Sequence, residues 1–365
     1  ETVHDRIMLE VTRGCIRGCR FCQAGMVYRP VREKSVETLD RQARALRAST
    51  GYDEISLSSL SISDYSQING LCDTLLQWTD AAKVNLSLPS MRLDMFSKEL
   101  MEKISSVRSS GLTFAPEAGT QRLRDAINKN VTEEDLLKAC RVAFEAGKNQ
   151  VKLYFMLGQP TETEEDLDGI VALAKRVVSE YYDVYRGVKG RRAPTVTISV
   201  ACFIPKPFTA FQWEAQNTLE TLKKKQMHIR YQLSDPKIKY NYHDAEVSVL
   251  EAVFARGNRK LSAALLEAHR RGIKFCAWEE FFNYEAWMSV LNDTGIDADF
   301  FASREIGEGE VLPWDIIDCG VTKEFLLRER HNAYCSKTNK NCAEGCTGCG
   351  ANKLGGERSW CSRMK

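Results

Sequence analysis

The chain has 365 residues, of which 43% are hydrophobic and 27% charged, and its formal net charge is +2. This composition is that of a globular protein with room for one large domain and a smaller one. No stretch approaches the ~20 apolar residues that a membrane span needs, and no signal peptide opens the chain. We therefore expect a cytoplasmic protein with no membrane partner. The first residue is not Met, and we expect a further N-terminal part.

Strands and helices are expected to alternate through the first 215 residues. The helix at residues 132–146 and the helix at 163–181 each open with a capping signature, Thr-x-x-Asp. Six short apolar strands that alternate with helices favour parallel β/α packing, as an open sheet or a partial barrel. Either arrangement gathers functional loops at the C-terminal ends of the strands. The expected strands are 6–11, 54–59, 84–90, 111–116, 151–157 and 195–203, and the other expected helices are 35–49, 65–80 and 97–107.

The alternation of expected strands and helices ends after residue 215. Residues 216–330 are expected to be mainly helical, and residues 331–365 form a Cys-rich tail too poor in apolar residues for a core of its own. Three domains follow: 1–215, 216–330 and 331–365. Within the second, residues 221–242 carry six Lys or Arg against one Asp, interleaved with three tyrosines. We interpret this stretch as a solvated amphipathic helix followed by a loop, with nucleic-acid binding as the alternative.

Three cysteines directly follow the first expected strand. Cys15, Cys19 and Cys22 have the spacing C-x3-C-x2-C. Three thiolates can bind three irons of a [4Fe–4S] cube, and an iron without a protein ligand is then free for chemistry. Zinc is the alternative, and it fits poorly because no fourth thiol or histidine lies nearby.

This cysteine motif after the first strand of a six-fold β/α unit resembles the radical S-adenosylmethionine (radical SAM) superfamily. The resemblance covers roughly residues 5–215. It implies an α/β fold, a partial (β/α)6 barrel followed by the mainly helical C-terminal region and the Cys-rich tail. In that family the open iron chelates the amino and carboxylate groups of SAM. The reduced cluster cleaves SAM to a 5′-deoxyadenosyl radical, which takes a hydrogen atom from the substrate. A reductant such as flavodoxin or ferredoxin would supply the electron.

The resemblance also implies residues that bind SAM. Phe21 would pack near the adenine, and Gly158 would let the fifth strand pass it. Ser58 and Ser59 stand where the family often has a Gly-Gly-Glu segment that receives the SAM amino group, and this chain lacks that segment.

The segment "FAPEAGTQRLRDAINKN" at residues 114–130 resembles a fourth-strand segment of the same family. Glu117 would approach SAM, and Lys129 would pair with its carboxylate. The alternative is a solvated glutamate at a helix start and a surface lysine.

The finer resemblance is to radical SAM proteins that carry a B12-binding domain, a group that is similar to methylthiotransferases. It implies cobalamin, held by an N-terminal domain outside this chain. The predicted function is methylation, or sulfur or methylthio insertion, at an unreactive carbon of RNA, a protein or a small molecule. The alternatives are a radical SAM dehydrogenase that uses an auxiliary cluster for electron transfer, and a non-catalytic metal-containing RNA-binding protein.

The tail carries the second group of cysteines. Cys342, Cys346 and Cys349 repeat the spacing of the opening triplet, and Cys335 and Cys361 flank them. No strand precedes this trio, so a second SAM site is not expected. We predict a second [4Fe–4S] cluster, with zinc as the rival and with Cys335 or Cys361 as the fourth ligand.

Overall fold

The computed structural model describes residues 5–88, 92, 112–354 and 361. The helix expected at 97–107 lies outside this part of the chain. Among the described residues, no helix is both long enough and apolar enough to cross a membrane.

The six expected strands are confirmed as β1, β4, β5, β6, β7 and β8. Each differs from its expected limits by a few residues at most, because strand ends are the least certain part of such predictions. The strands are β1 (Ile7–Glu10), β2 (Thr12–Arg13), β3 (Arg32–Glu33), β4 (Glu54–Ser58), β5 (Asn85–Ser87), β6 (Leu112–Glu117), β7 (Gln150–Leu157), β8 (Thr195–Cys202) and β9 (Ile238–Tyr242).

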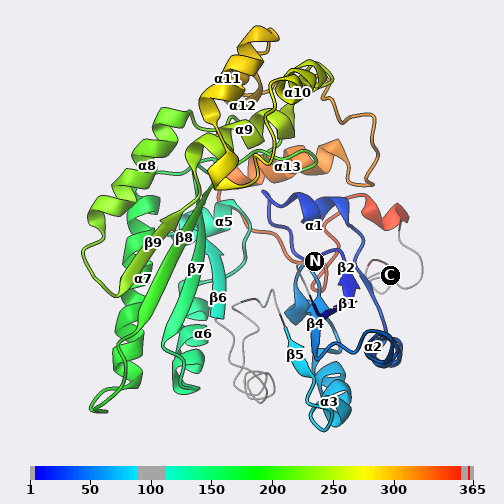
Figure 1. The fold of residues 1–365 in the computed structure, drawn as a ribbon, viewed down its shortest axis with the longest axis vertical. Coiled ribbons are helices and arrows are strands. Elements are labelled where there is room, and N and C mark those ends of the chain that lie inside the picture. The colour runs from blue at the N-terminus through cyan, green and yellow to red at the C-terminus, as the bar shows by residue number, and fades with distance from the viewer. Residues whose placement is uncertain (1–4, 89–91, 93–111, 355–360, 362–365) are drawn as a thin grey trace.

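Within the described residues, the strands form two parallel sheets and one short antiparallel pair, β2 with β3. One parallel sheet has the order β1-β4-β5 and the other β6-β7-β8-β9. Neighbours in each sheet follow one another along the chain, as expected for consecutive β/α units. In Figure 1 the two sheets lie side by side, with α2 and α3 beside the first and α6, α7 and α8 beside the second. This arrangement is consistent with a partial barrel of radical SAM type.

Strand β9 corrects the loop that was expected to follow the helix within residues 221–242. It pairs in parallel with β8, with Val196 opposite Ile238 and Val200 opposite Tyr242. Ile238, Tyr240 and Tyr242 alternate with Lys239 and Asn241, so a period-two signal was present in the sequence. The dense charge of the surrounding segment obscured it. The β/α pattern therefore continues into the region that was predicted to be mainly helical.

The helices complete the framework, and the region 216–330 is mainly helical as expected. Both predicted capping boxes are present, at α6 and α7, where the aspartate carboxylate accepts the amide hydrogen of the threonine three residues earlier at 2.8 Å. The helices are α1 (Gln23–Val27), α2 (Val36–Thr50), α3 (Ile68–Thr79), α5 (Gln121–Ala126), α6 (Glu133–Glu145), α7 (Glu164–Val184), α8 (Leu219–Gln232), α9 (Ala245–Arg256), α10 (Leu261–Arg270), α11 (Tyr284–Asp293), α12 (Ala298–Ala302) and α13 (Lys323–Tyr334), with short 3₁₀ turns η1 (Ile62–Asp64), η3 (Glu279–Phe281) and η4 (Ala351–Leu354).

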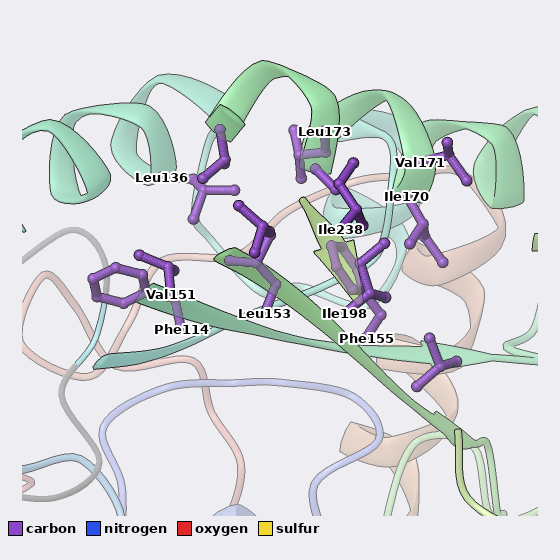
Figure 2. Close-up of a cluster of buried hydrophobic side chains, with 14 of the residues drawn as sticks. Phe114, Leu136, Val151, Leu153, Phe155, Ile170, Val171, Leu173, Ile198 and Ile238 are labelled. Carbon is purple, nitrogen blue, oxygen red and sulfur yellow. The ribbon is translucent and has the colours of Figure 1, made fainter. Parts of the chain in front are cut away.

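The largest hydrophobic core lies between the second sheet and its helices. Figure 2 shows Leu153, Phe155 and Ile198 of the sheet packed toward Ile170 and Leu173 of α7. All five side chains are buried, and burying each removes apolar surface worth roughly 1.5–3 kcal/mol from water. The core holds the strands of this sheet in register and so fixes the loops at their C-terminal ends.

The Cys-rich tail packs against the start of the chain. In Figure 1 the orange and red C-terminal segment lies beside the blue helix α1. The amide of Cys342 donates to the carbonyl of Ile16 at 2.9 Å, and Cys349 is buried in an apolar cluster with Met26 and Trp213. The tail therefore shares an apolar cluster with the rest of the molecule.

Candidate active site

The three cysteines of the opening triplet lie on the loop between β2 and α1. Gly14 starts the loop with φ +90°, and a Cβ there would lie 2.5 Å from the carbonyl oxygen of Tyr28. The amide of Arg17 donates to Sγ of Cys15, and the amide of Gly25 donates to Sγ of Cys22, both at 3.4 Å. These bonds suit thiolates, since an amide donor stabilises negative charge on sulfur.

A cavity of about 410 Å³ opens beside this loop. Its wall brings together residues from the loop, from β6 and from the turn after α5. Six residues selected from the sequence line it, namely Cys15, Cys19, Phe21, Cys22, Glu117 and Lys129. Two of these, Glu117 and Lys129, are separated from the other four by about a hundred positions in sequence, so their convergence is a property of the fold.

Glu117 and Lys129 form an ion pair in the cavity wall. Nζ of Lys129 donates to Oε1 of Glu117 at 3.1 Å, and the two side chains are only 13% and 16% exposed. Burial lowers the pKa of Lys129, but the charges of Glu117 and Cys19 outweigh it, so the pKa is raised. Neither residue is the solvated surface group of the alternative interpretation. The pair places a cation and an anion beside the cysteines.

Glu117 is held in an unusual backbone conformation. It ends β6 at φ +68°, just after an irregularity in the pairing with β7. The chain then passes so close to α7 that a Cβ on Gly119 would lie 2.2 Å from the carbonyl oxygen of Asp166. A non-glycine residue at positive φ costs energy and occurs preferentially at functional sites.

Two arginines of the cavity were missed in the sequence. Arg17 binds Asp64 through Nε at 3.0 Å and through Nη2 at 2.5 Å. Nη2 of Arg92 donates to the carbonyls of Lys129 and Asn130, both at 3.2 Å. With Lys129 they put three cations in the wall beside Glu117, which suits a ligand that carries a carboxylate. Arg17 lies inside the cysteine motif itself, a position that could have singled it out.

Ser58, Ser59 and Gly158 are not among the described residues that line the cavity. Ser58 ends β4, and Oγ of Ser59 is hydrogen-bonded to the hydroxyl of Thr12. Gly158 has φ +80°, and its amide donates to the carboxylate of Glu162 at 2.8 Å. Their contacts with SAM stay predictions.

The donor set fits an iron–sulfur cube better than a single ion. Among the described residues, no three Cys, His, Asp or Glu side chains converge closely enough to hold one metal ion. A zinc ion needs every ligand within about 2.0–2.3 Å of one point. A cube instead takes each thiolate on a different iron, so its cysteines lie farther apart. Burial raises the pKa of Cys15 to about 12, so binding must also displace its proton.

The tail cysteines lie in two settings. Cys335 is exposed at the end of α13, with Sγ 3.9 Å from Nε2 of His331. The other four are Cys342, Cys346, Cys349 and Cys361, of which Cys349 is buried and Cys346 is exposed.

Comparison with known proteins agrees with this geometry. Residues 9–174, which include the cysteine loop, Glu117 and Lys129, match the model of the radical SAM superfamily. These residues belong to the radical SAM superfamily. The radical SAM match accounts for the three cysteines on one loop, and it confirms the family that the sequence motif indicated.

Several relatives are similar to this radical SAM chain. It is 35% identical to the uncharacterized protein MJ0966 of Methanocaldococcus jannaschii, over 71% of this chain and 53% of the relative. It is 24% identical to the threonylcarbamoyladenosine tRNA methylthiotransferase MtaB of Aquifex aeolicus, over 74% of this chain and 63% of the relative. The chain thus spans between half and two thirds of the length of these curated relatives.

Among solved structures, the chain is similar to the radical S-adenosylmethionine methyltransferase TsrM of Kitasatospora setae. The TM-score is 0.39 and the identity 14%, over 53% of this chain and 36% of that chain.

Proposed function

We propose that this radical SAM enzyme adds a methyl or methylthio group to an unreactive carbon of RNA or protein. The main support for this proposal is the cavity whose wall contains Cys15, Cys19 and Cys22 together with the Glu117–Lys129 ion pair. The methylthiotransferase from Aquifex aeolicus, which matches 74% of this chain, supports the transfer reaction and a nucleic-acid substrate.

In this proposal the three cysteines bind the cube, and the charged wall binds the methionine end of SAM. Glu117 accepts from the SAM amino group, and Lys129 and Arg92 bind its carboxylate. A reduced cluster bound by these cysteines would supply the electron that cleaves SAM, so that a hydrogen atom could be taken from the substrate. Ala115, Val131 and Tyr154 form a partly apolar part of the cavity wall.

The proposal includes three further components. A flavodoxin or ferredoxin donates the electron, and cobalamin is held by a domain outside this chain. The tail holds a second metal centre, an iron–sulfur cluster rather than zinc, with Cys335 or Cys361 beside Cys342, Cys346 and Cys349.

The basic segment 221–242 gives little support to a purely RNA-binding protein. Its lysines form ion pairs within the molecule: Lys223 with Glu246, Lys224 with Glu220, and Lys225 with Glu162, at 2.6–2.7 Å. Paired lysines neutralise fewer phosphates, because an RNA would have to compete with a carboxylate for each of them.

The deciding experiment is anaerobic turnover of the reconstituted chain with SAM and dithionite. We expect 5′-deoxyadenosine, and its absence with a fully loaded cluster would overturn the enzyme proposal. Incubation with RNA or ribosomal proteins and SAM labelled in the methyl group then tests transfer. Labelled product supports the transferase. A product that has lost two hydrogens without gaining mass from SAM would establish the dehydrogenase instead.

A further inference from the structure

The second sheet has one face packed against helices and one open face. Figure 2 shows Leu153, Phe155 and Ile198 on the helix side, so the residues that alternate with them lie on the other side of the sheet. We call that side the open face, because none of its residues on β7, β8 and β9 is buried. Those that matter here are polar or aromatic, namely Lys152, Tyr154, Thr197, Ser199, Lys239 and Asn241.

The two lysines of the open face lie in one row across the sheet. Lys152 is in register with Thr197, and Thr197 with Lys239. Since neighbouring strands lie about 4.8 Å apart, the backbones of the two lysines are about 10 Å apart. Two cations at this separation can serve two phosphates of one extended chain.

Both lysines are available to a ligand. Within the described part of the chain neither forms an ion pair, although Lys239 belongs to the segment 221–242 whose other lysines are paired. Strands β7, β8 and β9 carry no Asp or Glu that could neutralise them. The open face is therefore positively charged and suits an anionic ligand.

Tyr154 connects the open face to the candidate active site. Its side chain is 40% exposed, and it lines the cavity together with Cys15 and Glu117. Nζ of Lys152 lies 4.6 Å from the centroid of the Tyr154 ring. An exposed ring with a cation beside it is the combination that binds single-stranded nucleic acid, because the ring stacks on a base and the cation binds the backbone.

The row that contains Tyr154 continues with uncharged polar side chains. Tyr154 is in register with Ser199, and Ser199 with Asn241. The hydroxyl of Ser199 and the amide of Asn241 make no hydrogen bond with any other described residue, so both can bind a ribose hydroxyl or a base edge. A peptide without acidic residues would leave both lysines unpaired, whereas RNA supplies a phosphate at every nucleotide.

We propose that the open face binds single-stranded RNA, with phosphates at Lys152 and Lys239 and a base stacked on Tyr154. The base on Tyr154 then lies at the cavity, where the hydrogen atom would be taken. The inference rests on the proposed function, which leaves RNA and protein open as substrates, and it chooses RNA.

The charge contribution is tested by RNA binding at several salt concentrations. The full chain is reconstituted anaerobically and titrated into a fluorescein-labelled single-stranded RNA of mixed sequence, followed by anisotropy. Lys152→Gln and Lys239→Gln should each weaken binding and reduce the slope of log affinity against log salt by about 0.7, the value for one lost phosphate contact. Lys138→Gln is the matched control, because Lys138 is exposed on α6, on the other side of the same sheet. It should bind RNA as the parent does.

The stacking contribution is tested with the same RNA. Tyr154→Ala should lower the affinity about 5- to 150-fold, the range for the loss of one base–aromatic stack. Tyr154→Phe keeps the ring and should bind as the parent does. Tyr182→Ala is the matched control, since Tyr182 of α7 is 46% exposed and has Nζ of Lys237 at 5.9 Å from its ring centroid. It should leave the affinity unchanged.

Equal affinities for the open-face variants and their controls would place RNA elsewhere and overturn the inference. A glutamate-rich peptide that binds more tightly than RNA, and loses affinity in the same variants, would assign a protein substrate instead. Formation of 5′-deoxyadenosine without RNA is measured in the same samples, and Lys239→Gln should keep it. A parent that cleaves SAM but binds no RNA would refute this inference alone, whereas a parent that does not cleave SAM would refute the proposed function.

Discussion

The two cysteine groups of this enzyme share the spacing C-x3-C-x2-C but have different surroundings. Cys15, Cys19 and Cys22 follow β2 and line a cavity of about 410 Å³ beside the Glu117–Lys129 pair. The tail group follows α13 and packs on the opening loop, where the amide of Cys342 donates to the carbonyl of Ile16.

The difference shows that spacing alone does not assign a reaction. The same three-thiol pattern lines a cavity in one place, whereas in the other Cys349 is buried and Cys346 is exposed. What differs is the neighbouring strand edge, which supplies a cavity and charged side chains. The predictions below test this contrast, from the largest expected effect to the smallest.

The largest difference is expected between Cys19→Ala and Cys346→Ala. Cys19→Ala should reduce 5′-deoxyadenosine formation to background, because the cluster at the cavity loses one of its three thiolates. Cys346→Ala should keep SAM cleavage and change only the second metal centre. Chromatographic assay of 5′-deoxyadenosine with dithionite checks both. Equal loss in the two variants would mean that the groups are not functionally distinct.

The second test concerns the contact that joins the two regions. Arg20 is fully buried and binds Glu329 of α13 at 3.2 Å, so Arg20→Met leaves a buried carboxylate without its partner. We expect the free energy of unfolding to fall by about 3–5 kcal/mol. Urea unfolding of the metal-free chain measures it.

Arg13→Met is the control for this change, since the Arg13–Glu10 pair in the same segment is exposed. It should cost less than about 1 kcal/mol. Similar losses in the two variants would show that the Arg20 contact does not hold the regions together.

The third test concerns the cavity of the opening triplet. Under the proposed function, Lys129→Ala removes a charge-assisted hydrogen bond to the SAM carboxylate. Such a bond is worth about 1.5–3 kcal/mol, so we expect about a 10- to 100-fold loss of SAM affinity. Calorimetric titration of the reconstituted protein measures it. Lys224→Ala, in an exposed pair with Glu220, should leave the affinity unchanged. An unaltered SAM affinity in Lys129→Ala would show that Lys129 pairs with Glu117 but does not bind SAM.

The smallest effect is a difference in thiol reactivity in the metal-free chain. Burial raises the pKa of Cys15 to about 12, whereas Cys346 is exposed. At pH 8 iodoacetamide should modify Cys15 at least about tenfold more slowly than Cys346, because only the thiolate reacts. The rate at Cys15 should keep rising until the pH approaches 12. Mass spectrometry of digested samples follows both sites, and equal rates at pH 8 would contradict the burial of Cys15.

The raised pKa of Cys15 also has a consequence for stability. The folded state holds the Cys15 proton more tightly than the unfolded state does, so this proton contributes to the free energy of unfolding at every pH below the unfolded-state pKa. That contribution is lost as the pH rises toward about 12, the pKa of Cys15 in the folded state.

The alternating elements could be predicted because each depends on local pattern. Ile7 and Leu9 of β1, and Ile55 and Leu57 of β4, are buried, as expected for short apolar strands. Strand β9 was missed because lysines flank and interrupt its alternation.

The candidate site was predicted where a family motif marked it and missed where it depends on long-range pairing. Arg20 was not selected, since arginines are usually exposed and nothing local indicates burial. Its partners lie far along the chain: Glu329 is 309 positions from Arg20. Asn128 is a further example of such long-range contacts. Its side-chain amide donates to the carbonyl of Gly18 and accepts from the backbone amide of Asn339. Such contacts follow only from the folded arrangement.

The bonds of Arg20 also set an order of events during synthesis. Its guanidinium donates to the carbonyl of Lys337, which is 317 positions later in the chain. At about 5–20 residues per second, a ribosome needs about 15–60 s to cover that distance. The opening loop therefore leaves the ribosome long before its last supporting contact exists. We expect iron to be delivered after chain release, and stalled chains that end before Glu329 to bind little iron compared with released full-length protein.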